Sequence, residues 1–212
     1  SITGKDREKN SFDFETSFIH HLSSPNPYRR KDDQSEEEFC IEKVKEFEDK
    51  ILEIGPNKVA AFIAEPILAS GGCIVHPKNY LKKFWEICKK YEILYISDEV
   101  VTGFGRLGHF FSSEKEFGII PDIITTAKGI TSGYIPLGAV LISDRLIKNI
   151  SKESSLFFHG YTYSGHPASC AAALKNIEII KRDKILEHVK NVGPYFKDFL
   201  RGGNFILILS TF

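Results

Sequence analysis

Short apolar runs that end in polar residues place the strongest limit on how this chain can fold. Val59–Ala64 is a continuous apolar run between Pro56 and Pro66, and this pattern is typical of a strand buried on both faces. The amphipathic segment Asn79–Tyr91 predicts a helix, and a second apolar run, Ile93–Ser97, follows it. A strand, a helix and a strand in this order predict a parallel crossover unit.

Four further segments extend this pattern. Ser35–Gly55 has an acidic first turn and apolar residues at helical spacing, which predict a helix. Asp122–Thr126 and Leu137–Ser143 are two more apolar stretches, and Ala168–Lys181 reads as an Ala-rich helix. The predicted fold class is therefore α/β, with residues 1–34 as an irregular lead-in.

Charge and cysteine content narrow the class of protein. Lys plus Arg and Asp plus Glu both number 28, so no basic field attracts nucleic acid or an anionic membrane. The four cysteines form no C-x-x-C pair and no zinc spacing, which indicates reduced structural thiols and no metal site. The apolar runs are shorter than the ~20 residues of a membrane-spanning helix. The chain opens without a secretory signal, so we expect a cytoplasmic protein.

Polar residues follow the predicted strands at the points where the strands end. Glu65 follows the first, Asp98 and Glu99 the second, and Lys128 the third. Parallel sheets bind ligands at the carboxyl ends of their strands. We therefore expect carboxylates and one lysine to converge at that edge of the sheet.

Lys128 is the candidate nucleophile. A lone lysine after a strand is usually a solvated cation, but Gly129 beside it permits a close approach of the backbone. A lysine partly desolvated in a cleft has a lowered pKa and can form a Schiff base. Schiff-base chemistry with pyridoxal phosphate also needs a carboxylate against the ring nitrogen. Asp98 is placed for that role, although a strand cap or an ion pair explains its spacing equally well.

Four stretches together carry a resemblance to a known family. The sequence resembles the class III aminotransferases of fold type I in AAFIAEPILASGG (60–72), YISDEVVTGFGRLG (95–108), PDIITTAKGITSGYIPLGAVLIS (121–143) and FFHGYTYSGHPASCAAAL (157–174). The resemblance covers most of the chain, in the order and spacing of the family. It implies a three-layer α/β/α large domain with a mostly parallel sheet, over residues 35–200.

The resemblance also implies roles for individual residues. Lys128 is then the lysine that binds pyridoxal phosphate, Asp98 the partner of the ring nitrogen, and Val100 a residue that packs on the ring. Thr162 is implied to reach the cofactor phosphate of a neighbouring subunit, which predicts a homodimer with composite active sites. Glu65 matches the glutamate of the A-E-P motif, either in the cofactor network or as a satisfied buried carboxylate.

The implied reaction is a transamination. An amino group passes from an amine or amino acid to a keto acid such as pyruvate, and Lys128 moves the proton. The wording is most similar to the omega-amine branch. Ornithine-type members carry Gly-Glu where this chain has Ala69 and Ser70, and Gln where it has Val101, which argues against ornithine substrates.

The chain is shorter than members of the family. The N-terminal part and the small C-terminal domain have no counterpart, and residues 201–212 form an atypical tail. We therefore expect a fragment, for which an inactive product that binds cofactor or a full-length subunit is the alternative function. Close relatives also include aminomutases and a decarboxylating member.

A different enzyme class is suggested by the glycines of GFGRLG (103–108), which match the G-x-G-x-x-G dinucleotide fingerprint. That motif requires a helix to open at the glycines, and HFFSSEKEFG (109–118) predicts no clear helix there. Arg106 within this stretch is expected to form a structural ion pair or to line the site entrance. An oxidoreductase that uses a nicotinamide cofactor is therefore disfavoured.

Overall fold

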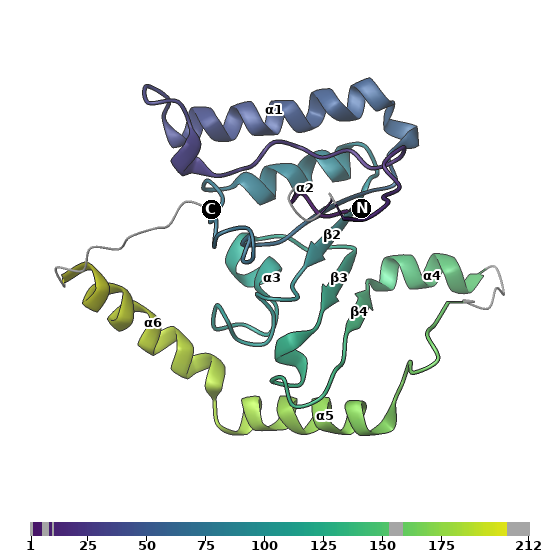
Figure 1. Ribbon diagram of the computed structural model, residues 1–212, viewed down its shortest axis with the longest axis vertical. Helices are drawn as coiled ribbons and strands as arrows, with labels where there is room; N and C mark the ends of the chain where they lie inside the picture. The colour runs from purple at the N-terminus through teal and green to yellow at the C-terminus, as the bar shows by residue number, and fades with distance from the viewer. Residues whose placement is uncertain (1, 6–8, 10, 153–158, 203–212) are drawn as a thin grey trace.

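A four-stranded sheet with helices beside it forms the centre of the computed structural model, which describes residues 2–5, 9, 11–152 and 159–202 (Figure 1). The strands lie in chain order: β1 Ala61–Ala64, β2 Leu94–Asp98, β3 Ile123–Thr126 and β4 Ala139–Ile142. β1, β2 and β3 are parallel to one another, whereas β4 runs antiparallel to β3. The α/β class is confirmed, with a mixed sheet.

The helices begin and end close to their predicted positions. α1 spans Glu36–Ile54 and starts with a capping box, in which Ser35 and Glu38 each bond to the backbone of the other. α2 spans Tyr80–Lys90, as its amphipathic pattern predicts. The remaining elements are α3 Ser112–Phe117, α4 Asp144–Lys152, α5 Pro167–Arg182, α6 Ile185–Gly202 and the 3-10 turns η2 Pro27–Arg29, η3 Pro56–Lys58 and η4 Lys128–Ile130.

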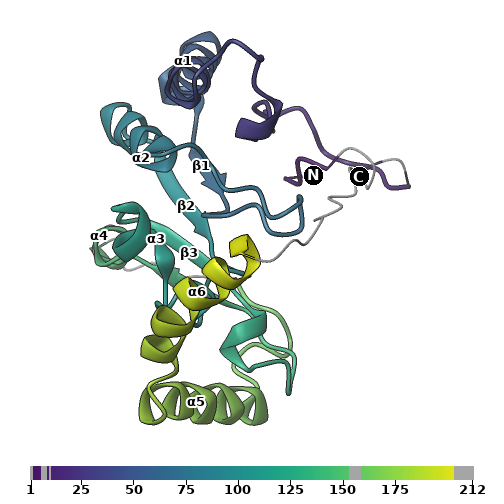
Figure 2. The ribbon, with the colours of Figure 1, turned by 90° about the vertical axis from the view of Figure 1, so that its left-hand side faces the viewer.

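The main hydrophobic core lies between one face of the sheet and the two longest N-terminal helices. Figure 2 shows α1 and α2 on the same side of the strands. Phe47 of α1 and Phe84 of α2 stack with ring centroids 4.5 Å apart, and Phe62 of β1 packs against both rings. Tyr95 of β2 is 2% exposed below them. Burial of each such side chain contributes about 2 kcal/mol.

The opposite face of the sheet is more open than the sequence predicts. Val59–Ala64 was expected to be buried on both faces, but Ala61 and Ile63 of β1 are exposed. Val140 of β4, on the same face, is also exposed. This prediction is wrong for the described residues, because β1 is an edge strand and α1, α2 and α3 all pack on the other face.

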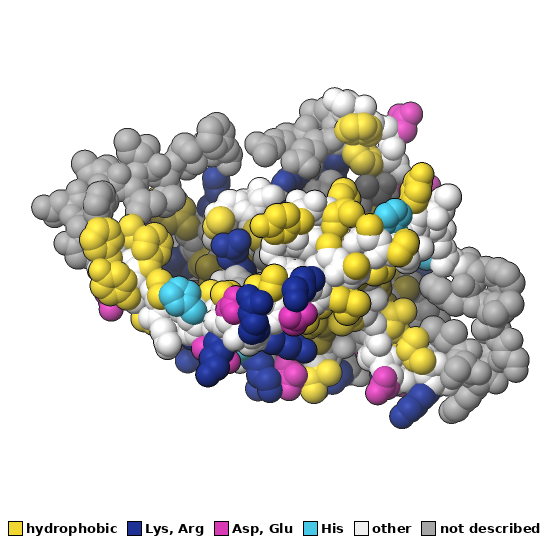
Figure 3. Space-filling view, turned by 90° about the horizontal axis from the view of Figure 1, so that it is seen from below, with side chains coloured by type: hydrophobic (Ala, Val, Ile, Leu, Met, Phe, Trp, Pro, Cys, Tyr) yellow, Lys and Arg dark blue, Asp and Glu magenta, His cyan; other side chains and the backbone are white. Residues whose placement is uncertain are grey.

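The C-terminal part of the described chain consists of α5 and α6. Apolar side chains are exposed among charged ones on the face seen from below (Figure 3). The exposed apolar residues of these two helices include Leu174, Tyr195 and Phe196. Most of the tail predicted over residues 201–212 lies outside the described residues. Within the described part, no helix combines the length and apolar character needed to cross a membrane.

The carboxylate of Glu99 holds the connection between β2 and α3. Its side chain is completely buried, and one oxygen accepts hydrogen bonds from the Ser113 backbone N–H (2.9 Å) and hydroxyl (2.5 Å). The other oxygen accepts from the Ser112 N–H (2.7 Å) and the Thr102 hydroxyl (3.1 Å). Glu99 thereby caps α3, whose own N-cap residue, Phe111, makes no side-chain bond.

We predict that Glu99→Gln lowers the free energy of unfolding by about 2 kcal/mol, because an amide N–H₂ then faces backbone and hydroxyl donors. Urea unfolding followed by circular dichroism measures this change. The matched control is Glu114→Gln in the same helix, where the exposed side chain pairs only with Lys115, so its effect should be close to zero. Equal effects of the two substitutions would contradict the prediction.

Candidate active site

Lys128 lies in the turn that follows β3 and begins η4. Its backbone has φ 43°, a left-handed conformation that non-glycine residues rarely adopt. The side chain is exposed, so the expectation of a lysine partly desolvated in a cleft is wrong for the described residues. The physical reason is its position past the end of β3, at an edge of the sheet that the described residues leave open. No hydrogen bond or ion pair joins its amine to another described residue.

Gly129 makes the close backbone approach that the sequence predicts. A Cβ atom at this position would lie 2.9 Å from the Cβ of Phe104 and 3.3 Å from the carbonyl oxygen of Gly103. A Cβ at Gly103 would in turn lie 2.7 Å from the carbonyl oxygen of Glu99. The loop after β2 therefore packs directly on the Lys128 turn, and this packing requires glycine at both positions.

Asp98 is the last residue of β2, next to the strand that leads into Lys128. Its register partner in β3 is Thr125, so the two strands end at the same edge of the sheet. The Val100 N–H donates a 3.0 Å hydrogen bond to Oδ1 of Asp98, which fixes the carboxylate at the start of the loop. Asp98 and Val100 are both half-buried.

Glu65 follows β1 and brings a second carboxylate to this edge. Its Oε2 accepts a 3.2 Å hydrogen bond from the Ala69 N–H. Burial raises the pKa of Glu65 above its ordinary value and the charge of Asp98 adds to the rise, whereas the Ala69 N–H and the charge of Lys128 oppose it. The three predicted residues are thus close enough to influence one another electrostatically.

His76 supports the Glu65 segment and was missed by sequence reasoning. Its Nε2–H donates a 2.9 Å hydrogen bond to the carbonyl oxygen of Glu65, and its ring stacks on Tyr80 at a centroid distance of 4.9 Å. Burial lowers the pKa of His76 to about 4, so the ring is neutral at physiological pH. No spacing in the sequence links this histidine to Glu65.

Thr162 lies in an exposed turn before α5, whose N-cap is His166. No hydrogen bond connects Thr162 to Lys128 or Asp98 within the described part of the chain. Its proposed contact is with a neighbouring subunit, so its role stays a prediction. The neighbouring Phe157 and Phe158 of the same motif lie outside the described residues.

The glycines at 103–108 do not form a dinucleotide site. They lie in a series of turns, and the following helix α3 begins only at Ser112. The N-terminal amides of α3 already bind the Glu99 carboxylate, so they are not available to a pyrophosphate. Arg106 is exposed and forms no ion pair with a described residue, so the expected structural pair is not found.

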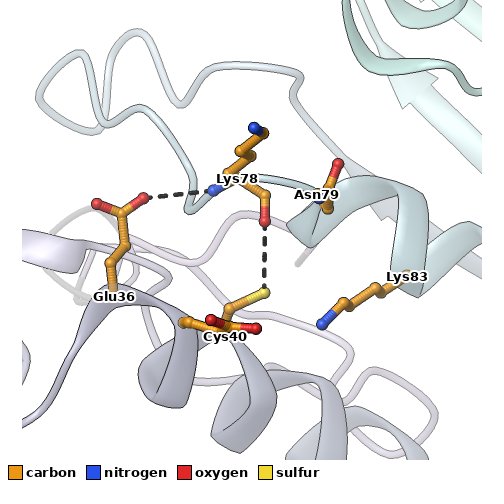
Figure 4. A pocket seen from close by; sticks show the side chains of 6 residues that line it. Glu36, Cys40, Lys78, Asn79 and Lys83 are labelled. Atoms are coloured by element: carbon orange, nitrogen blue, oxygen red, sulfur yellow. Dashed lines mark hydrogen bonds between the residues drawn. The ribbon is translucent and has the colours of Figure 1, made fainter.

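A separate cavity of about 330 Å³ lies between the N-terminal ends of α1 and α2 (Figure 4). The Cys40 thiol there donates to the Lys78 carbonyl oxygen, and the Lys78 N–H donates to Glu36. Burial raises the pKa of the Cys40 thiol, which keeps it protonated and unreactive. None of the predicted site residues lines this cavity, so it is not part of the candidate site.

Comparisons with known proteins identify the family. The class III aminotransferase family model matches residues 1–203. The chain is 46% identical to putrescine–pyruvate aminotransferase of Pseudomonas aeruginosa over 87% of its length, which is 40% of that relative. It is 42% identical to a chloroplastic gamma-aminobutyrate transaminase of Solanum lycopersicum over 95% of its length, which is 39% of that protein.

Solved structures agree with the sequence relatives. The omega-transaminase of Pseudomonas jessenii in complex with PMP superimposes with a TM-score of 0.86 at 40% identity, over 92% of this chain and 44% of that one. The chain thus spans about two fifths of the length of the curated relatives it matches. The family match, the order of Glu65, Asp98 and Lys128 along the sheet edge, and the shared fold lead to one conclusion: the chain belongs to the class III aminotransferases.

Proposed function

We propose that this chain forms the cofactor-binding core of an aminotransferase that moves an amino group from an amine or amino acid to a keto acid. Pyridoxal phosphate is the proposed cofactor, and Lys128 the residue that binds it. The observation that carries the proposal is the placement of the Lys128 amine and the Asp98 carboxylate after neighbouring strands that end at one edge of the sheet.

The chemistry of these residues fits the cofactor. Pyridoxal phosphate supplies an aldehyde that condenses with primary amines and a ring that withdraws electrons. Lys128 offers an exposed primary amine, with no described partner competing for it, for a Schiff base with that aldehyde. Asp98 has one oxygen bonded to Val100 and a second oxygen, Oδ2, that can accept the proton of the ring nitrogen. Val100 would pack on the ring.

Lys128 has a second role in the proposed reaction. When the incoming amine displaces it, the freed amine of Lys128 lies beside the reacting carbon and transfers the proton as a general base and acid. Negative charges at Asp98 and Glu65 surround this amine and stabilise its protonated form. Geometry and charge at the same edge therefore support both binding and proton transfer.

The relatives support a substrate class. One of them is a putrescine–pyruvate aminotransferase and another a gamma-aminobutyrate transaminase, so their names share a terminal amino group on the donor. We infer a donor of this type and pyruvate as the acceptor. The Ala69, Ser70 and Val101 positions, which depart from the ornithine-type pattern, agree with this inference.

A homodimer with composite active sites is part of the proposal. Tyr161 and Tyr163, on either side of Thr162, are each 80% exposed. Exposed aromatic side chains next to one another are typical of surfaces that a partner covers. In the proposed dimer, the Thr162 hydroxyl of one subunit binds the phosphate in the site of the other.

Borohydride reduction after incubation with pyridoxal phosphate tests the role of Lys128. We expect peptide mass spectrometry to find the phosphopyridoxyl group on Lys128 in preference to other exposed lysines, because the Asp98 carboxylate orients the ring there. Lys128→Ala should lose this label and retain the weak labelling of surface sites. Uniform labelling of all exposed lysines, with none favoured, would contradict the proposal.

Asp98→Asn provides the matched test of ring binding. The amide keeps the shape of Asp98 and one acceptor, but cannot take a proton from the ring nitrogen, so the selectivity for Lys128 should fall by about ten-fold or more. The control is Asp144→Asn, an exposed carboxylate at the start of α4. Selectivity that is unchanged in Asp98→Asn would remove Asp98 from the site.

The raised pKa of Glu65 predicts a pH-dependent cost to stability. The folded state binds the carboxyl proton more tightly than the unfolded state, whose pKa is near 4.5, so stability is lost as pH rises above that value. Glu65→Gln removes this loss. We expect the variant to gain stability over the wild type at about pH 7 and little at about pH 4. Urea unfolding at both pH values measures the difference, and a pH-independent gap would refute the explanation.

A further inference from the structure

The turn that carries Lys128 has a backbone conformation that needs outside support. Lys128 and Ser132 have φ values of 43° and 51°, and Gly133 has φ 79°. Side chains on the first two residues disfavour these values, and such conformations persist only where surrounding contacts hold them. The contacts that hold this turn therefore also determine where the Lys128 side chain begins.

Asn176 of α5 supplies side-chain contacts to this turn. Its Nδ2 donates hydrogen bonds to the carbonyl oxygens of Gly129 (2.8 Å) and Ile130 (3.1 Å). Its Oδ1 accepts a 2.7 Å hydrogen bond from the Ser132 hydroxyl. Both amide hydrogens face acceptors and the oxygen faces a donor, so this orientation of the amide is the one that the surrounding groups require.

The helix that presents Asn176 is itself anchored. Ala173 and Ile180 are both 6% exposed and lie on the same face of α5 as Asn176, at helical spacing. α5 runs beneath the ends of β3 and β4 (Figure 1). Asn176 thus projects from a packed helix face, which makes it a fixed point against which the Lys128 turn is held.

We infer that Asn176 is a positioning residue for Lys128: its amide clamps the three residues after the lysine and so sets the direction of the amine toward Asp98. This inference rests on the proposed function. An aspartate at the same place would put carboxylate oxygens against the Gly129 and Ile130 carbonyls while still accepting from Ser132. Asn176→Asp is therefore the sharpest variant, because it changes the donors and leaves the size and the third contact unchanged.

The first measurement is amide hydrogen exchange without cofactor. The N–H groups of Thr131, Ser132 and Tyr134 donate to carbonyls within the same turn. In Asn176→Asp we expect these amides to exchange about ten-fold faster than in the wild type, because repulsion from the carboxylate opens the turn. The control is Glu178→Gln, an exposed α5 residue paired only with Lys175, which should leave the exchange unchanged.

The second measurement is the rate of phosphopyridoxyl labelling of Lys128 relative to Lys115, an exposed lysine far from the turn in sequence. All variants are compared well below their melting temperatures. A misplacement of about 1 Å can cost about 100-fold in rate, so we expect the Lys128 to Lys115 ratio to fall about ten-fold or more in Asn176→Asp. A residue with only a structural role would lower the melting temperature without changing this ratio.

The outcomes separate this inference from the proposed function. Faster exchange of the turn together with a lowered labelling ratio supports the positioning role. Unchanged exchange, or faster exchange with an unchanged ratio, overturns it while the selective labelling of wild-type Lys128 keeps the proposed function intact. Absence of selective labelling in the wild type rejects the proposed function, and the positioning role with it.

Discussion

The parallel pairing of β2 with β3 is the constraint on which the rest of the site depends. It places Asp98 opposite Thr125, and the pairing continues one residue further through the Glu99 N–H, which donates to the Thr125 carbonyl oxygen at 2.9 Å. The two strands therefore end together, and Lys128 follows the second at the same edge. A shift of one residue would turn the Asp98 side chain to the opposite face of the sheet.

Asp98 and Glu99 are adjacent carboxylates with opposite roles because successive side chains of a strand point to opposite faces. Asp98 faces the open side, where it is half-buried and keeps an unused oxygen. Glu99 faces the interior, where four donors surround its carboxylate. The interior residue fixes the loop that carries Gly103, and that loop packs on Gly129. One carboxylate thus serves the site through chemistry and the other through structure.

The sequence predicts those features that follow from local pattern. Apolar runs and helical spacing located β1, β2, α1 and α2, and residue type with strand position pointed to Lys128 and Asp98. Burial could not be predicted in the same way, because exposure of Ile63 and Lys128 depends on what covers an edge or a face. Asn176 was missed for a related reason: its contact with the turn joins segments distant in the chain, and an asparagine within a helix carries no local signal.

The antiparallel return of β4 has a consequence for the motions available to the lysine. Thr126 and Ala139 are register partners, so the intervening residues 127–138 form a loop whose two ends are already joined by the sheet. Closing such a loop costs conformational entropy, and here the folding of the sheet has met that cost before any ligand arrives. What remains free at Lys128 is mainly rotation about its own side-chain bonds. The lysine therefore behaves as a tethered arm on a fixed pivot, able to swing between partners without the backbone having to follow.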